Sequence, residues 1–126
     1  MTRQLLFVGG VVHALGVLFH LALPRLRAWR DGVRGLSDTQ RGLLQLFNAH
    51  VGYALLIFAV LSFGYPRELL STPVGGAITI MIGGFWVLRA ASEFIWRPRV
   101  SPLTLTLCFS MACLYAILGF GARLPL

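Results

Sequence analysis

The chain has 126 residues, of which 57% are hydrophobic and only 12% are charged, and its mean hydropathy is +0.79. These values exclude a water-soluble domain, because too few polar side chains remain to cover a compact body in water. All 11 basic residues are arginine, which also excludes a lysine nucleophile or Schiff base. The net charge is +7, and the arginines that carry it lie mainly at the ends of apolar segments. This distribution indicates contact with anionic lipid head groups and not with nucleic acid.

Four apolar segments are each close to the ~20 residues that a helix needs to cross a bilayer. They comprise residues 5–23, 43–63, 74–96 and 100–120 and take up most of the chain. A helix satisfies its own backbone hydrogen bonds in lipid. We therefore expect one all-α domain over residues 1–126, an integral membrane bundle of four transmembrane helices.

The breaks between these segments carry residues that start and stop helices. Pro24 closes the first segment, and Ser37 with Gln40 forms a capping-box pattern ahead of the second. The third and fourth are each preceded by an N-cap residue and a proline at the first helical position, Thr72-Pro73 and Ser101-Pro102. These signals support helices and not strands.

The connection at 25–37 carries apolar side chains at a helical spacing, with arginines on the adjoining sector. The apolar positions are Leu26, Trp29, Val33 and Leu36. This pattern predicts a short interfacial helix that lies on the inner leaflet. The alternative is a plain linker whose arginines serve only as a topology signal.

Arginine is distributed unevenly between the two sides of the expected bundle. The two connections on one side carry it at positions 25, 27, 30, 34, 41, 97 and 99, whereas the other side has Arg3, Arg67 and Arg123. The positive-inside rule places the arginine-rich connections in the cytoplasm. Both termini are then expected outside.

The two cysteines, Cys108 and Cys113, lie five residues apart in the fourth segment. On a helix their side chains point about 140° apart and their Cα atoms exceed the ~7 Å limit for a disulfide. We interpret both as small hydrophobic residues, with a reactive thiol as the alternative.

Polar side chains within spans are costly, and they therefore point to function. The candidates are His13, His20, Gln45, Asn48, His50, Arg89 and Glu93. At a rise of ~1.5 Å per residue from the cytoplasmic ends, His20, Asn48, His50, Arg89 and Glu93 all fall in the cytoplasmic half. Arg89 and Glu93 are four residues apart and can pair. The sequence therefore predicts a polar pocket that opens toward the inner leaflet.

The second span cannot direct all its polar side chains toward one axis. Gln45 and Asn48 share a face, but Asn48 and His50 are separated by about 200° at 100° per residue. Either His50 or the Gln45/Asn48 pair then faces lipid or another subunit. Since exposure to lipid is costly, this favours an oligomer.

The same residues also fit a role in packing alone. Arg89 and Glu93 can form a self-neutralising pair, and His, Asn and Gln can join helices through hydrogen bonds. Close helix approach is expected at Gly75, Gly76, Gly83 and Gly84, and interface positions at Tyr65, Trp86 and Trp96.

Haem or a metal ion is a further alternative, although the sequence identifies no cofactor. Haem could lie between His50 and either His13 or His20, with Arg89 near a propionate. The composition also allows a metal site of His20, His50 and Glu93.

The segment from Arg41 to Asn48 resembles the opening of the second helix in the membrane-associated eicosanoid and glutathione metabolism superfamily. Arg89 is similar to another arginine of that family, whereas Val51 stands where the family has a glutamate. The family has four spans and forms trimers that bind glutathione between subunits at the cytoplasmic side. The resemblance implies a glutathione-transferase-like membrane enzyme.

A second resemblance covers nearly the whole chain. It rests on Gln45-Leu-Phe-Asn48-Ala-His50, Arg67-Glu68-Leu-Leu-Ser-Thr-Pro73 and Phe85-Trp86-Val-Leu-Arg89-Ala-Ala-Ser-Glu93. These stretches resemble a group of small uncharacterised bacterial four-span membrane proteins. The resemblance implies a bacterial inner membrane and brings no activity with it.

The sequence thus predicts an oligomeric inner-membrane protein whose pocket binds an amphipathic ligand or cofactor. The expected ligand-binding residues are His20, Gln45, Asn48, His50, Arg89 and Glu93. A non-catalytic accessory or packing subunit of a membrane complex is the alternative.

The arginine distribution yields a topological prediction. A reporter fused at Leu126 should be active only if it requires the periplasm, because both termini are expected outside. Activity of a cytoplasm-specific reporter at that position would contradict the prediction and would move the expected pocket to the outer leaflet.

Overall fold

The computed structural model describes residues 2–96 and 100–121, and it confirms the all-α fold with four membrane-length helices. The elements are α1 (Thr2–Ala22), η1 (Leu23–Arg25), α2 (Arg27–Gly32), α3 (Asp38–Gly64), α4 (Pro66–Ser71), α5 (Pro73–Trp96) and α6 (Pro102–Gly121). The protein is therefore a multi-pass membrane protein. Three of the arginines that set the expected topology, Arg97, Arg99 and Arg123, lie outside the described residues. The side chain of Trp96 lies outside them too.

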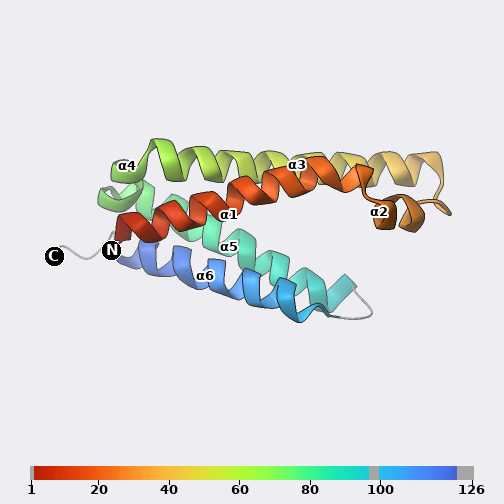
Figure 1. Cartoon of the computed structure of the whole chain (residues 1–126). Helices are drawn as coiled ribbons and strands as arrows, with labels where there is room; N and C mark the ends of the chain where they lie inside the picture. The colour runs from red at the N-terminus through yellow and green to blue at the C-terminus, as the bar shows by residue number, and fades with distance from the viewer. Residues whose placement is uncertain (1, 97–99, 122–126) are drawn as a thin grey trace.

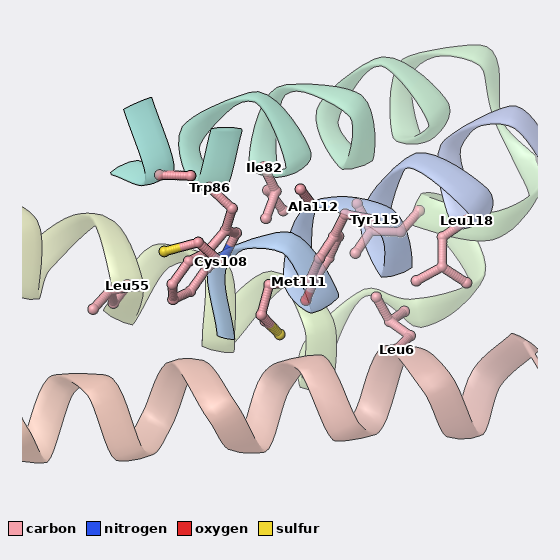
Figure 2. Close-up of a cluster of buried hydrophobic side chains, with 11 residues drawn as sticks. Leu6, Leu55, Ile82, Trp86, Cys108, Met111, Ala112, Tyr115 and Leu118 are labelled. Carbon is pink, nitrogen blue, oxygen red and sulfur yellow. The ribbon is translucent and has the colours of Figure 1, made fainter. Parts of the chain in front are cut away.

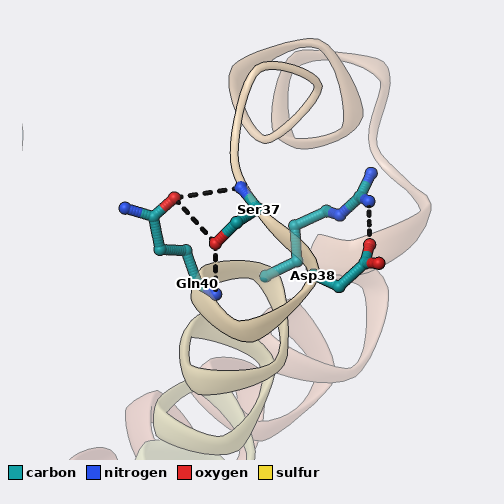
Figure 3. A network of polar contacts seen from close by, with 4 residues as sticks. Ser37, Asp38 and Gln40 are labelled. Carbon is teal, nitrogen blue, oxygen red and sulfur yellow. Dashed lines mark hydrogen bonds and ion pairs between the residues drawn. The ribbon is translucent and has the colours of Figure 1, made fainter.

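The helix starts agree with the expected caps. The Ser37 side chain accepts from the Gln40 backbone N–H at 3.3 Å, and the Gln40 side chain accepts from the Ser37 N–H at 2.9 Å (Figure 3). This capping box starts α3 at Asp38, five residues ahead of the apolar segment. Thr72 and Ser101 cap α5 and α6 by accepting from the third residue of each helix.

The four long helices form two antiparallel pairs, α1 with α3 and α5 with α6 (Figure 1). The pairs meet at the end that carries α4, which contacts both of them, and they diverge toward the end that carries α2 (Figure 1). We call these the α4 end and the α2 end. The expected cytoplasmic side corresponds to the α2 end.

The hydrophobic core lies mainly between α5 and α6, with single large side chains added from the other pair (Figure 2). Trp86 of α5 and Tyr115 of α6 are buried in it, together with Leu6 from α1 and Leu55 from α3. The apolar side chains on the outer faces of the helices are exposed, as expected for surfaces in contact with lipid.

The expected interfacial helix over 25–37 is shorter in the structure. After η1, α2 spans only six residues, and hydrogen-bonded turns at Arg34 and Leu36 lead into α3. Trp29 and Val33 are half-buried, whereas Leu26 is exposed. The expected apolar stripe is therefore only partly covered by the protein.

Two glycines of α5 offer a matched test of close helix packing. A Cβ on Gly75 would collide with the backbone of Glu68 in α4, whereas one on Gly84 would meet nothing within 4 Å. Gly75→Ala should therefore destabilise the protein by about 1–3 kcal/mol. Gly84→Ala should leave stability unchanged or raise it by up to about 1 kcal/mol, because alanine favours helix. Thermal denaturation in detergent measures both, and equal effects would contradict the packing.

Candidate functional site

A chain of hydrogen bonds between buried side chains joins all four membrane-length helices. Trp86 Nε1 of α5 donates to His13 Nε2 of α1 at 3.0 Å. His13 Nδ1 lies 3.3 Å from the Tyr115 hydroxyl of α6, which lies 2.8 Å from the Ser62 hydroxyl of α3. Ser62 donates to the Phe58 carbonyl oxygen on its own helix at 2.8 Å. Each spanning helix thus contributes at least one group.

The groups at the two ends, the Trp86 indole and the Phe58 carbonyl, fix the donor and the acceptor of every hydrogen bond between them. The indole of Trp86 can only donate, so His13 Nε2 accepts and the proton of a neutral imidazole lies on Nδ1. That Nδ1–H donates to the Tyr115 oxygen, whose own proton points to Ser62. The geometry therefore assigns one neutral tautomer to His13 and one direction to the whole chain.

These assignments give His13 a role in packing. Both of its ring nitrogens are engaged, so neither presents a lone pair to haem or a metal ion in this arrangement. The hydrogen-bonded chain ends at an indole N–H, which can only donate, and at a backbone carbonyl oxygen, which can only accept. The arrangement therefore links the four spanning helices through buried side chains.

Sequence reasoning did not identify the partners of His13. Trp86 is expected at a membrane interface, but only 7% of it is exposed, and its ring stacks on His13 at a centroid distance of 5.8 Å. A Cβ on Gly9 would lie 2.5 Å from the Tyr115 hydroxyl, so this glycine admits the phenol to α1. Ser62, a hydroxyl among apolar residues near the end of the second apolar segment, is the signal that could have pointed to the site.

His20 and Asn48 form a second group, between α1 and α3. Asn48 Nδ2 donates to the His20 carbonyl oxygen at 2.9 Å, which fixes Oδ1 as the acceptor 2.7 Å from His20 Nδ1. His20 Nδ1 is thus a donor, and its Nε2 makes no hydrogen bond with the described residues. Gly52 allows this approach, since a Cβ there would lie 3.3 Å from that of His20.

Arg89 and Glu93 form a third group on α5. Arg89 Nη2 lies 2.6 Å from Glu93 Oε1, and Nη1 donates to the Ser92 hydroxyl at 3.2 Å. The Glu93 side chain is fully buried, whereas 38% of the Arg89 side chain is exposed. Cys108 of α6, a buried residue, lies within electrostatic reach of both charges. The pair expected from the i, i+4 spacing is therefore present, with only its cation at the surface.

The structure does not bring Gln45 and His50 to either group. Both are exposed on α3, and Asn48 is the polar residue that faces α1. No spanning helix continues opposite Gln45, because α1 ends at Ala22, two residues after His20. His50 Nδ1 donates to the carbonyl oxygen of Leu46 at 2.8 Å, which lowers the cost of its exposure.

Four of the six expected pocket residues therefore lie in two groups, His20 with Asn48 and Arg89 with Glu93, on helix pairs that diverge toward the α2 end (Figure 1). Residues 2–96 and 100–121 contain no cluster of three or more His, Cys, Asp or Glu side chains that could hold a metal ion. His20, His50 and Glu93 are accordingly not assembled as a metal site. A haem between His20 and His50 has no geometric support either, since about 200° of α3 separates His50 from Asn48, the contact of His20.

Comparisons with protein-family models, with curated proteins and with solved structures found no match for this chain. The two resemblances drawn from the sequence therefore stay predictions. The polar groups within the spans are the observations that bear on function.

The hydrogen-bond chain predicts a specific stability effect. Tyr115→Phe removes the acceptor of the buried His13 Nδ1–H and should destabilise the protein by about 1–3 kcal/mol. Thr106→Val is the control on the same helix, because the exposed Thr106 hydroxyl bonds only to the Pro102 carbonyl within its own helix. Chemical or thermal denaturation in detergent compares them, and a Tyr115→Phe protein as stable as the control would contradict the assigned chain.

Proposed function

We propose that this chain is a bacterial inner-membrane protein that binds an amphipathic ligand through an anionic head group at Arg89, near the cytoplasmic side. One observation carries the proposal: a guanidinium within a spanning helix is part-exposed, while the carboxylate that orients it is buried. The topology inferred from the arginine distribution supports the cytoplasmic side.

The position of Arg89 makes an external anion favourable. It lies seven residues before the end of α5, about 10 Å along the helix. The neighbouring side chains Val87 and Leu88 are 58% and 70% exposed, as expected for residues that face lipid tails. A guanidinium at such a surface is costly unless its N–H groups find acceptors. Phosphate and carboxylate oxygens are the strongest acceptors for it.

Glu93 acts in this proposal as a positioning residue. It holds Nη2 on the protein side, and Ser92 holds Nη1, so the planar guanidinium has a fixed orientation. Arginine has five N–H donors, and these two contacts leave others for a ligand. The buried carboxylate therefore presets the exposed edge of the guanidinium without covering it.

His20 is the partner expected from the other helix pair. Asn48 fixes its ring, and its Nε2 can accept a hydrogen bond from a protonated oxygen of the head group. The two helix pairs diverge toward this end (Figure 1), and the proposed ligand would contact both from the inner leaflet. An oligomer would add a subunit surface beside Gln45 and His50, and it stays a prediction.

An accessory subunit without a ligand is the second candidate. The hydrogen bonds of His13 support it, because they join intramembrane polar side chains of different helices to one another. Under this alternative Arg89 and Glu93 would likewise be only an internal ion pair.

A double-mutant cycle separates the two functions. Arg89→Leu leaves the buried Glu93 carboxylate without this partner and should cost about 2–4 kcal/mol, somewhat below the range for fully buried pairs because Arg89 is part-exposed. Arg89→Leu combined with Glu93→Leu should recover most of the stability. Under the ligand proposal the double variant folds but loses the co-purified anionic amphiphile, as measured by native mass spectrometry.

Arg67→Leu combined with Glu68→Leu is the charge-matched control for the double variant, because both residues lie on α4 at the opposite end of the molecule. It should retain the amphiphile bound by the unmodified protein. An Arg89→Leu, Glu93→Leu protein that folds and retains every bound amphiphile would refute the ligand proposal and leave the packing role.

A further inference from the structure

A pocket of about 600 Å³ lies at the α2 end, between α2 and the start of α3, and Arg89 of α5 does not line it. Four arginines, one aspartate and one valine line it: Arg27, Arg30, Asp31, Val33, Arg34 and Arg41. Its volume is about twenty times the ~30 Å³ that one water takes in the liquid. The pocket therefore has room for a hydrated phosphate or diphosphate group.

The charges of this pocket do not balance. Asp31 is shared by Arg27 at 3.8 Å and Arg34 at 3.4 Å, and Arg41 pairs with Asp38. Arg30 forms no ion pair with the described residues. Asp31 in the lining and Asp38 beside it thus offset two of the four guanidinium groups, and two positive charges remain for an external partner.

The pocket lies where the protein leaves the hydrocarbon. The 27 residues of α3 extend about 40 Å, roughly 10 Å more than the hydrocarbon of a typical bilayer. The first turn of α3 is polar, and the exposed apolar surface begins directly after Arg41, with Leu43 and Leu44 exposed by 48% and 37%. An anion bound among the arginines can therefore be joined to acyl chains that run along α3.

We infer that this pocket binds the head group of a membrane lipid that carries two negative charges on phosphate, as a phosphomonoester or a diphosphate. The charge of the ligand matches the two unbalanced guanidinium groups. Arginine suits phosphate because its planar fork donates two parallel hydrogen bonds. The adjoining apolar start of α3 selects a lipid over a free anion. This site is independent of the ligand proposed at Arg89, and either can fail alone.

The test uses the full-length chain in phosphatidylcholine nanodiscs that contain equal amounts of phosphatidic acid, a phosphomonoester lipid, and phosphatidylglycerol, which carries one charge. Native mass spectrometry measures which lipid is retained. The unmodified protein should favour phosphatidic acid by about tenfold, equivalent to one additional charge-assisted contact. Arg30→Gln with Arg34→Gln should bring the two lipids to near parity.

Arg25→Gln with Arg67→Gln removes the same charge outside the pocket, since Arg25 bonds to the Leu21 carbonyl and Arg67 lies at the other end. This control should keep the preference. Equal loss in both double variants would overturn the site and leave only a general electrostatic field. No preference in the unmodified protein would overturn it as well.

Two further arms complete the test. Arg30→Lys with Arg34→Lys preserves the charge that sets topology but not the bidentate geometry, and it should also lose most of the preference. A lysine variant that matches the unmodified protein would overturn bidentate head-group binding. Inorganic pyrophosphate at the lipid's concentration should displace no phosphatidic acid, and full displacement would overturn the assignment to a lipid. The Arg89→Leu, Glu93→Leu protein should keep the preference, which separates this site from the one at Arg89.

Discussion

The arrangement of the four spans depends on the hydrogen bond between the Trp86 indole and His13. This bond joins the two helix pairs and forces the imidazole to present its other nitrogen as a donor to Tyr115. In lipid, helix association gains little from the hydrophobic effect, so a fully satisfied polar chain and close packing supply specificity instead. The contact of His13 with Tyr115 in turn fixes the register between α1 and α6, and Gly9 lies against the same phenol.

Below this polar layer the two pairs separate, and the remaining polar groups divide between them. His20 and Asn48 belong to one pair, whereas Arg89 and Glu93 belong to the other. Within each of these two pairs of residues, side-chain atoms are hydrogen-bonded to one another or to their neighbours. Each pair leaves hydrogen-bonding capacity for a ligand, at Nε2 of His20 or at the exposed edge of Arg89. The helix pairs are thus joined toward the α4 end and separate toward the α2 end within the same molecule.

The sequence predicted the helices because their signals are local. Apolar length, the Ser37–Gln40 box and the N1 prolines act within a few residues and need no tertiary information. The i, i+4 pairing of Arg89 with Glu93 was accessible for the same reason. The partners of His13 were not, because Trp86 and Tyr115 lie 73 and 102 residues away and meet it only through the rotation of each helix. The choice between Asn48 and His50 likewise required knowing where α1 lies.

The unequal lengths of the spans have a further consequence. The 20 residues of α6 match the hydrocarbon thickness of a bilayer, whereas the longer α3 begins with a polar turn at the α2 end, where its additional length is expected to leave the hydrocarbon. Bilayers with longer or shorter acyl chains therefore shift the plane of the head groups along α3, while the core between α5 and α6 stays the same. The acyl-chain length of the bilayer thus sets how deeply Arg27 and Arg30 of α2 lie in the membrane interface.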